Sequence, residues 1–389
     1  MAIVINQTPA TASLAQSPII FSVYETTAVV ANNGFQYMAD LYYWTGSVSN
    51  SGSLDYTLAK YPNTSLRGIF DLNRIINSTL TDLAIQNTSN VMYFACDFYY
   101  QYLSGSSQYT YVTGSHTKSQ VYKALDGYGI FQEAIGAPIY SLTPYWPLMT
   151  DGPATQSVFT TDTGNAGVYF GNAGTGSTPT KIVYTSNLGT ANYTLTGSTS
   201  SSGQIAQYPI GPAQSGFPLS GSFTYFQTQA YNGATPIGSP ITYNVECIQK
   251  YPNVRIKWKN RFGQFDYFDF YMVNRQSFST EKRTYQPQLG TWQANTLSYN
   301  DYDSSTLNYI ADSKQAISVN TFFISEDYNN ILKQLLVSDE IYWMYDEANN
   351  RVRPLTITNQ NIVFKTGVVD KLIQYQFDFN FGQAYKLII

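Results

Sequence analysis

Short runs in which apolar and polar side chains alternate recur along the chain and predict β-strands. The closing run is the strictest, because every second residue from Tyr375 to Phe381 is aromatic and the residues between them are polar. A period of two places these rings on one face of a strand, which must be buried against a core or a partner. We expect further strands at residues 19–24, 35–44, 91–102, 109–113, 222–230, 240–249, 340–345 and 351–358.

Helical spacing of apolar residues appears in two places. The first helix is predicted after Asp71, a suitable capping residue, and the second after Ser325. Their apolar stripes are Leu72, Ile75, Ile76, Leu80 and Leu83 in the first, and Tyr328, Ile331, Leu332, Leu335 and Leu336 in the second. The predicted fold is therefore mainly β, with two or three β-sandwich-like domains and two short packed helices.

The segment 258–270 is dense in aromatic residues and has one glycine near its centre. A strand, a tight turn at Gly263 and a second strand would account for it, because glycine accepts turn conformations that a side chain resists. Trp258, Phe265 and Phe268 are expected to anchor a core.

The 389 residues are too many for one ordinary core, so the chain should divide. We expect an N-terminal arm at 1–17, a β-rich domain with one helix at 18–147, a Gly/Ser/Thr-rich β-sandwich insertion at 148–249, and a β-rich domain with one helix at 250–389. A flexible linker is the alternative for the Gly- and Ser-rich part of the insertion.

Charged residues make up only 12% of the chain, whereas aromatic residues make up 16%. Such a composition excludes a disordered protein. A surface this poor in charge is weakly solvated when bare, and tyrosine is enriched at subunit contacts. We therefore favour a homo-oligomer over a monomer with an uncharged surface.

Net charge is −4, so a nucleic-acid partner is not expected. The densest basic run holds Arg255, Lys257, Lys259 and Arg261, which share one face of a strand. Phosphate or acidic residues of a partner would suit this face, and a solvated strand face is the interpretation we favour.

No catalytic residue is predicted, and the chain is not expected to be an enzyme. His116 is the only histidine and lies in a polar turn, which is typical of a surface loop rather than of a triad. The carboxylate pairs Asp266 with Asp269 and Asp301 with Asp303 are the candidates for glycoside hydrolysis, but solvated acids explain them better.

No metal or cofactor site is predicted either. A calcium loop beginning at Asp301 would need glycine where Thr306 stands, and the Gly-rich segment 171–176 lacks the Lys and Ser or Thr of a phosphate loop. Cys96 and Cys247 are expected to be buried thiols. Aromatic clusters at 42–44, 98–100 and 144–147 would suit sugar rings, but on strands alternate members of such clusters fill a core.

The N-terminus does not resemble a signal peptide, and no apolar run approaches the length of a membrane span. We therefore expect a protein that is made in a cytoplasm and is used there or carried outward inside a particle, without a membrane partner.

Three stretches of the chain together resemble virion structural proteins of tailed bacteriophages that infect Bacteroidota, including crAss-like phages. They are residues 18–23 followed by Phe35-Gln36-Tyr37, the segment Trp258 to Phe268, and residues 335–342 followed by 353–357 and the closing aromatic strand. The resemblance covers most of the chain in order, except residues 150–240, which look like an insertion.

This resemblance implies a structural protein that self-assembles in the tail or neck of a virion, as a ring, hub or baseplate adaptor. It implies contacts with further copies and with portal, tail or baseplate components, and assembly in the cytoplasm of the host bacterium. It implies no active site. A receptor-binding or head-decorating module that contacts host glycans is the alternative.

Overall fold

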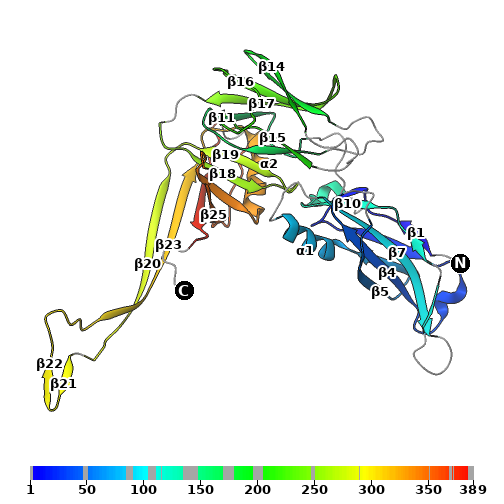
Figure 1. The fold of residues 1–389 in the computed structure, drawn as a ribbon, viewed down its shortest axis with the longest axis horizontal. Helices are drawn as coiled ribbons and strands as arrows, with labels where there is room; N and C mark the ends of the chain where they lie inside the picture. Colours follow the sequence, from blue (N-terminus) through cyan, green and yellow to red (C-terminus); the bar gives the residue numbers. More distant parts are fainter. Residues whose placement is uncertain are drawn as a thin grey trace. The chain divides into compact units, whose positions relative to one another are not determined.

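The chain is mainly β, as the sequence predicts (Figure 1). The computed structural model describes residues 3–46, 51–84, 91–103, 111–114, 116–134, 148–169, 179–195, 205–246, 250–288, 290–349, 351–367, 370 and 372–383. The described residues include two α-helices, α1 (Asn73–Ala84) and α2 (Asn329–Val337).

Contacts divide the chain into two units, which are described separately. Unit 1 consists of Met1–Cys247 and Lys259–Asp266, and unit 2 consists of Ile248–Trp258 and Tyr267–Ile389. The chain therefore enters unit 2, returns briefly to unit 1, and enters unit 2 again. The four-part division predicted from the sequence stays a prediction.

The first part of unit 1 is a sandwich of two sheets. One sheet has the strand order β1-β3-β6, and the other has the order β2-β10-β7-β4-β5 with β8 and β9 paired to β7. Phe21 of β3 contacts Phe98 of β7, with ring centroids 5.2 Å apart, so the two sheets share one core. The strands are β1 (Val4–Gln7), β2 (Ala12–Leu14), β3 (Ile20–Tyr24), β4 (Gln36–Trp44), β5 (Leu54–Lys60), β6 (Arg67–Asp71), β7 (Val91–Leu103), β8 (Tyr111–Thr113), β9 (Thr117–Lys118) and β10 (Tyr122–Leu125).

The N-terminal residues belong to this sandwich, in place of the extended arm predicted for residues 1–17. β1 pairs antiparallel with β3, and β2 pairs parallel with β10. All three residues of β2 are buried. Strands of three or four residues are too short to show an alternating pattern, and their partners lie elsewhere in the sequence, so composition alone suggested an arm.

The second part of unit 1 is a five-stranded sheet with a two-stranded sheet against it. The larger sheet has the order β11-β17-β16-β13-β14, and the smaller one joins β12 to β15. The buried Tyr184 of β13 donates a hydrogen bond to the carbonyl oxygen of Pro209 in β15, which connects the two sheets. The strands are β11 (Thr155–Phe159), β12 (Asn165–Tyr169), β13 (Lys181–Ser186), β14 (Gly189–Thr194), β15 (Ile205–Pro209), β16 (Tyr225–Asn232) and β17 (Thr235–Glu246).

Unit 2 is built on a seven-stranded sheet with the order β19-β18-β24-β25-β26-β23-β20. Helix α2 contributes its apolar side chains to the same core as the sheet, including Leu332 and Leu335, which are fully buried. The strands are β18 (Val254–Lys259), β19 (Phe265–Phe270), β20 (Arg275–Tyr285), β23 (Leu307–Asn320), β24 (Ile341–Asp346), β25 (Arg351–Ile357) and β26 (Gln376–Phe381).

Both predicted helices are present, and their apolar stripes are buried or partly buried where the structure describes them. Asp71 accepts hydrogen bonds from the backbone N–H groups of Ile19 and Asn73, which fixes the start of α1. Ser325 precedes a short 3₁₀ turn (Glu326–Tyr328), but its side chain makes no capping bond to the backbone. The closing strand buries Phe377 and Phe379 completely in the core of unit 2.

Candidate functional site

The turn between β18 and β19 is held by one asparagine. Its side-chain oxygen accepts hydrogen bonds from the backbone N–H groups of Phe262 and Gln264, each at 3.0 Å, and its amide nitrogen donates to the carbonyl oxygen of Met149 at 2.8 Å. This residue, Asn260, is buried. Gly263 has φ +73° and makes the turn possible, as predicted.

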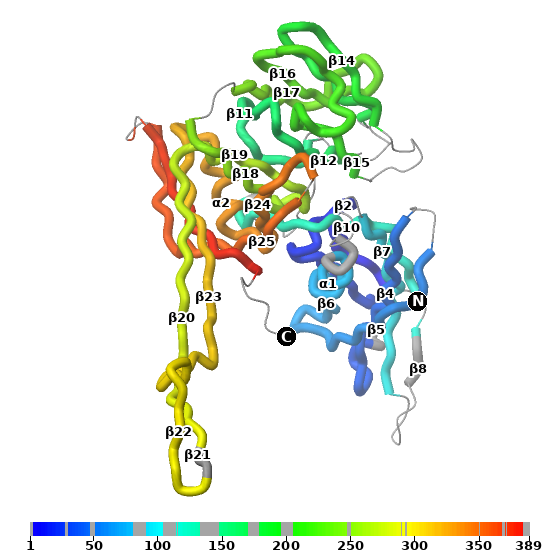
Figure 2. Tube along the Cα trace, turned by 60° about the vertical axis from the view of Figure 1, so that its left-hand side comes forward, coloured from blue at the N-terminus to red at the C-terminus, as the bar shows by residue number. Residues whose placement is uncertain are grey.

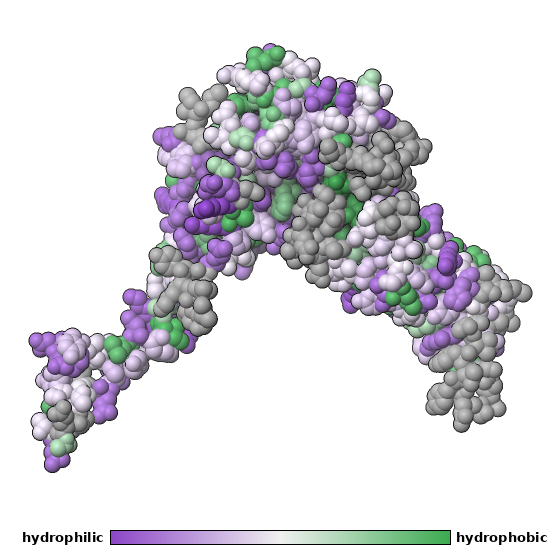
Figure 3. Space-filling view, viewed as in Figure 1, coloured by the Kyte–Doolittle hydropathy of each residue, from purple (hydrophilic) through white to green (hydrophobic). Residues whose placement is uncertain are grey.

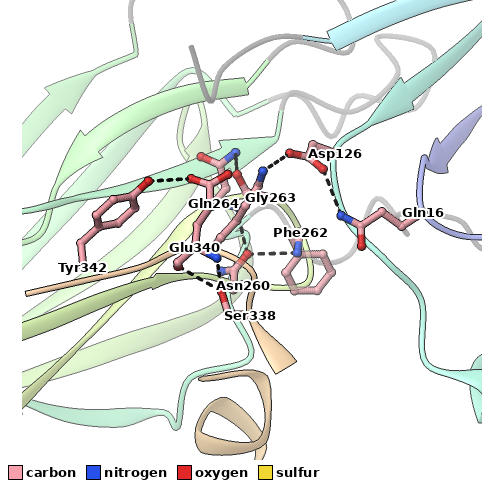
Figure 4. A network of polar contacts seen from close by, with 10 residues as sticks. Gln16, Asp126, Asn260, Phe262, Gly263, Gln264, Ser338, Glu340 and Tyr342 are labelled. Atoms are coloured by element: carbon pink, nitrogen blue, oxygen red, sulfur yellow. Dashed lines mark hydrogen bonds and ion pairs between the residues drawn. The ribbon is translucent and has the colours of Figure 1, made fainter. Parts of the chain in front are cut away.

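The basic side chains of this turn are buried against acids, which corrects the solvated face predicted for the run 255–261. Lys259 forms an ion pair with Asp126, and Arg261 forms one with Asp151. All four residues belong to unit 1. Figure 4 shows Asp126 with Gln16 as a further hydrogen-bond donor, at 3.4 Å. The sequence could not show these ion pairs, because the two acids come from distant parts of the same chain.

A second buried pair crosses the same hairpin within unit 2. Arg255 forms an ion pair with Asp269, and the two side chains are 2% and 4% exposed. The guanidinium of Arg255 also lies over the ring of Tyr267, 5.0 Å from its centroid. Asp269 is therefore not the solvated acid that the sequence predicted, and its charge is neutralised inside the unit.

Asp266 is also buried, contrary to the prediction of a solvated acid. Burial raises the pKa of its carboxyl group to about 7, hydrogen bonds from Thr150 and Asn260 oppose this rise, and the charge of Asp151 adds to it. No basic residue is a source of this shift. The two acids of the predicted pair thus have different environments, and neither faces an open site.

His116 meets an acid as well. Its Nδ1 lies 3.0 Å from Oδ2 of the buried Asp97, and its ring stacks on Tyr99 with centroids 4.4 Å apart. The side chain of His116 is 51% exposed, which agrees with the predicted surface position. The hydroxyl of Ser119 in the neighbouring segment accepts from the backbone of Cys96 and donates to the carbonyl of Gln120. This serine is therefore not placed as a nucleophile of that histidine.

The other motifs weighed for chemistry form no site among the described residues. Asp303 is partly exposed and accepts a hydrogen bond from the backbone of Asn300, as a turn acid does. The described part of the chain contains no group of three metal-ligating side chains. None of its helices is long and apolar enough to cross a membrane. The segments 144–147 and 171–176, and Cys247, lie outside the described residues.

The aromatic clusters on β7 and the remaining cysteine are core elements, as expected. Phe98 and Tyr100 point into the first sandwich, while Tyr99 between them lies on the opposite face of the strand. Cys96 is a buried free thiol, and burial raises its pKa. These residues are occupied by packing.

A long hairpin of unit 2 has the opposite character. β23 pairs with β26 only through residues 316–320, whereas its ladder with β20 continues along the whole of β20. Beyond residue 316, β20 and β23 pair only with each other. At the far end of this hairpin, β21 (Thr291–Gln293) and β22 (Thr296–Ser298) form a small sheet (Figures 1 and 2). We call residues 275–315 the arm.

The arm exposes an unusual amount of apolar surface for a two-stranded element. All eleven residues of β20 are exposed. The large apolar side chains that the arm leaves exposed are Phe278, Tyr285, Leu297, Tyr299, Tyr302, Leu307 and Tyr309. In Figure 3 green patches interrupt the hydrophilic surface along this part of the molecule. Because two strands alone are marginally stable in water, such a hairpin is typical of a contact with something else.

The charged side chains of the arm have a different environment from those of the turn at Asn260. Glu281 and Asp312 stand directly opposite each other in the ladder, an arrangement that destabilises a strand pair. No ion pair joins the arm's charged side chains to other described residues, in contrast to those of the turn at Asn260. β20 is also the last strand of its sheet, so its outer backbone groups have no strand partner among the described residues.

The arm was not predicted from the sequence. β20 shows no apolar alternation that would mark a buried face. That missing alternation was the available signal: a long run of β-forming residues with polar side chains on both faces indicates a strand with no core to face.

No protein-family model matches the chain, and no curated protein sequence is significantly similar to it. The function of the chain is therefore inferred from its fold and its surface.

Proposed function

We propose that the chain is a structural virion protein that self-assembles and links neighbouring subunits in the tail or neck of a phage, as a ring, hub or baseplate adaptor. The arm is the observation that carries the proposal, because its exposed rings, its charges without an ion pair among the described residues and its open strand edge suit a contact with other subunits. The resemblance of three sequence stretches to phage structural proteins supports the same role.

The chemistry of the described residues is in keeping with a role without catalysis. Of the acids that the sequence offered for hydrolysis, Asp269 is paired with Arg255, and Asp266 is buried and faces the turn asparagine rather than an open cleft. In this proposal the protein works by burying surface against identical copies and against portal, tail or baseplate components. It is assembled in the cytoplasm of the host bacterium and has no membrane or nucleic-acid partner.

Imaging of the purified protein by negative stain, together with its quantification in purified particles, tests this role. We expect closed rings or a fixed number of copies in each particle. A protein that stays monomeric and is missing from particles would contradict the proposal. Hydrolytic activity that is abolished by Asp266→Ala or Asp301→Ala would contradict the non-enzymatic role.

A module that binds host glycans is a second candidate. Tyr299 and Tyr302 near the far end of the arm are 66% and 84% exposed, and such rings stack on sugars. Binding of the wild-type protein to host polysaccharide, lost in a Tyr299→Ala, Tyr302→Ala double variant that still assembles, would favour this candidate.

A further inference from the structure

The outer edge of β20 carries a self-complementary order of side chains. From Arg275 to Glu281 the residues read Arg-Gln-Ser-Phe-Ser-Thr-Glu, and Phe278 stands at the centre. Residues at equal distances on either side of Phe278 form the pairs serine with serine, glutamine with threonine, and arginine with glutamate. Two antiparallel copies of this strand, centred on Phe278, would therefore place complementary side chains opposite each other.

Strand geometry allows this match to be used. In an antiparallel pair related by a twofold axis, residues at equal distances from the axis face each other and their side chains lie on the same side of the sheet. With the axis at Phe278, Arg275 of each copy faces Glu281 of the other. In the ladder with β23, Arg275 pairs with Ser318 and Glu281 pairs with Asp312, with no bulge between them. Because Arg275 and Glu281 are six positions apart, both charges stand on the same face of the arm.

The same pairing relieves a fault within the arm. Glu281 stands opposite Asp312 in its own hairpin and has no ion pair with a described residue. Arg275 of a second copy would bring a positive charge next to this acidic pair, and it would do so twice because of the symmetry. Phe278 of one copy would meet Phe278 of the other on the opposite face, where its side chain is 52% exposed in the single chain.

Other registers and other edges fit less well. An axis at Lys282 would also pair Glu281 with Arg283 twice, but it would place two Lys282 side chains against each other. An axis at Glu281 would oppose two carboxylates. On the edge strand β5, Asp55 and Lys60 are five positions apart and thus lie on opposite faces, and β14 carries no charge.

The edge strand β6 has a related order, but its charges are used within the chain. Arg67 and Asp71 lie at equal distances from Ile69. Asp71, however, accepts two backbone hydrogen bonds at the start of α1, and Arg67 lies over the ring of Tyr24, 5.5 Å from its centroid. The charges of β20 are not held in this way.

We propose that β20 pairs with β20 of a second copy of this chain, antiparallel and about a twofold axis at Phe278. The inference rests on the proposed assembly function and names the partner of the arm. A twofold contact closes on itself, so it joins copies two at a time and leaves any ring to other faces of the chain.

Charge reversal tests the pairing. Arg275→Glu and Glu281→Arg each replace two attractive contacts with two repulsive ones, so each should weaken the dimer about tenfold or more. The double variant restores both contacts with the signs exchanged and should recover most of the affinity. Lys282→Glu is the control, because it changes the net charge as Arg275→Glu does but lies on the other face of the same strand.

Dimer dissociation constants from sedimentation equilibrium give the answer. Single variants that match the wild-type protein, or a double variant as weak as the singles, would overturn the pairing. A wild-type protein that is monomeric in solution would overturn it too. If that monomer is nevertheless found in particles in fixed number, the assembly function stands without this contact.

A cysteine variant gives a second readout that does not depend on charge. Two Phe278→Cys side chains would face each other across the axis, within reach of a disulfide under mild oxidation. Thr280→Cys is the matched control, since it would face Gln276 and not itself. Covalent dimers should form with the first variant and not with the second or with the wild-type protein; equal yields would contradict the register.

Discussion

Two hairpins of this chain use similar residues in opposite ways. The hairpin of β18 and β19 and the arm of β20 and β23 both mix aromatic rings with a high local density of charge. In the first, Arg255 and Arg261 are nearly fully buried and each meets an acid of the chain. In the second, every side chain of β20 is exposed and none of its charged groups forms an ion pair with a described residue.

The difference separates structural charges from charges that are available to a partner. A buried ion pair contributes little net stability, but removing one partner is costly because the other charge is left without compensation. An exposed charge on an edge strand costs little to keep and discourages wrong pairing. The first hairpin therefore belongs to the fold, and the second is the region that can change without loss of the fold.

Removal of Arg255 should have the largest effect on stability. Arg255→Ala leaves the carboxylate of Asp269 buried without its cation, and we expect a loss of about 3–5 kcal/mol in the free energy of unfolding. Arg283→Ala on the arm should change it by less than about 0.5 kcal/mol. Urea unfolding of both variants measures the contrast, and equal losses would show that the arm is as structural as the first hairpin.

Two glycines with nearly the same backbone φ angle, one in each hairpin, allow a direct comparison of the two hairpins. Gly263 in the first hairpin has φ +73° and Gly290 in the arm has φ +71°, and a Cβ atom at either would clash with a backbone oxygen. Gly263→Ala should cost about 1–3 kcal/mol of global stability. Gly290→Ala should leave the urea midpoint unchanged, because the strain is confined to the far end of the arm.

Amide hydrogen exchange locates the effect of each glycine variant. In Gly290→Ala faster exchange should be limited to β21 and β22. A global loss of protection in that variant would mean that the arm folds together with the core of unit 2.

The first hairpin should also make stability depend on pH. The pKa of Asp266 is about 7 in the folded chain and 3.8 ordinarily, so the folded chain keeps a proton that the unfolded chain has lost between these values. Stability from this group is complete below about pH 4 and is lost as the pH rises through about pH 7. The slope is at most about 1.4 kcal/mol per pH unit.

Asp266→Asn should remove this slope, because an amide does not titrate in this range. The variant should gain stability relative to the wild-type protein as the pH rises towards about 7. A slope that persists in Asp266→Asn would assign the titration to another group.

The sequence predicted those features that depend on local pattern. The stripes of α1 and α2, the turn at Gly263 and the buried rings of β26 follow from the spacing of residues close together in the chain. The same reasoning predicted one strand face for Arg255 and Arg261, whereas β18 ends at Lys259 and Arg261 lies in the turn.

The missing information lies in long-range contacts. Arg261 and its partner Asp151 are 110 residues apart, and no local pattern links them. A charged strand face that packs against acids of a distant segment has the same local sequence pattern as a charged strand face in water. The arm escaped prediction for the converse reason, because an exposed strand has no apolar period by which to recognise it.

Shortening of the arm tests the central claim that it serves contacts between subunits. Ser279 and Lys314 stand opposite each other in the ladder, so residues 279–314 can be replaced by an Asn-Gly turn while the pairing of β23 with β26 is kept. Sedimentation velocity of the full chain and of this variant, at equal concentration, measures the mass of each. The account predicts that the variant stays folded but forms assemblies with fewer subunits than the full chain, whereas the same number of subunits in both would contradict it.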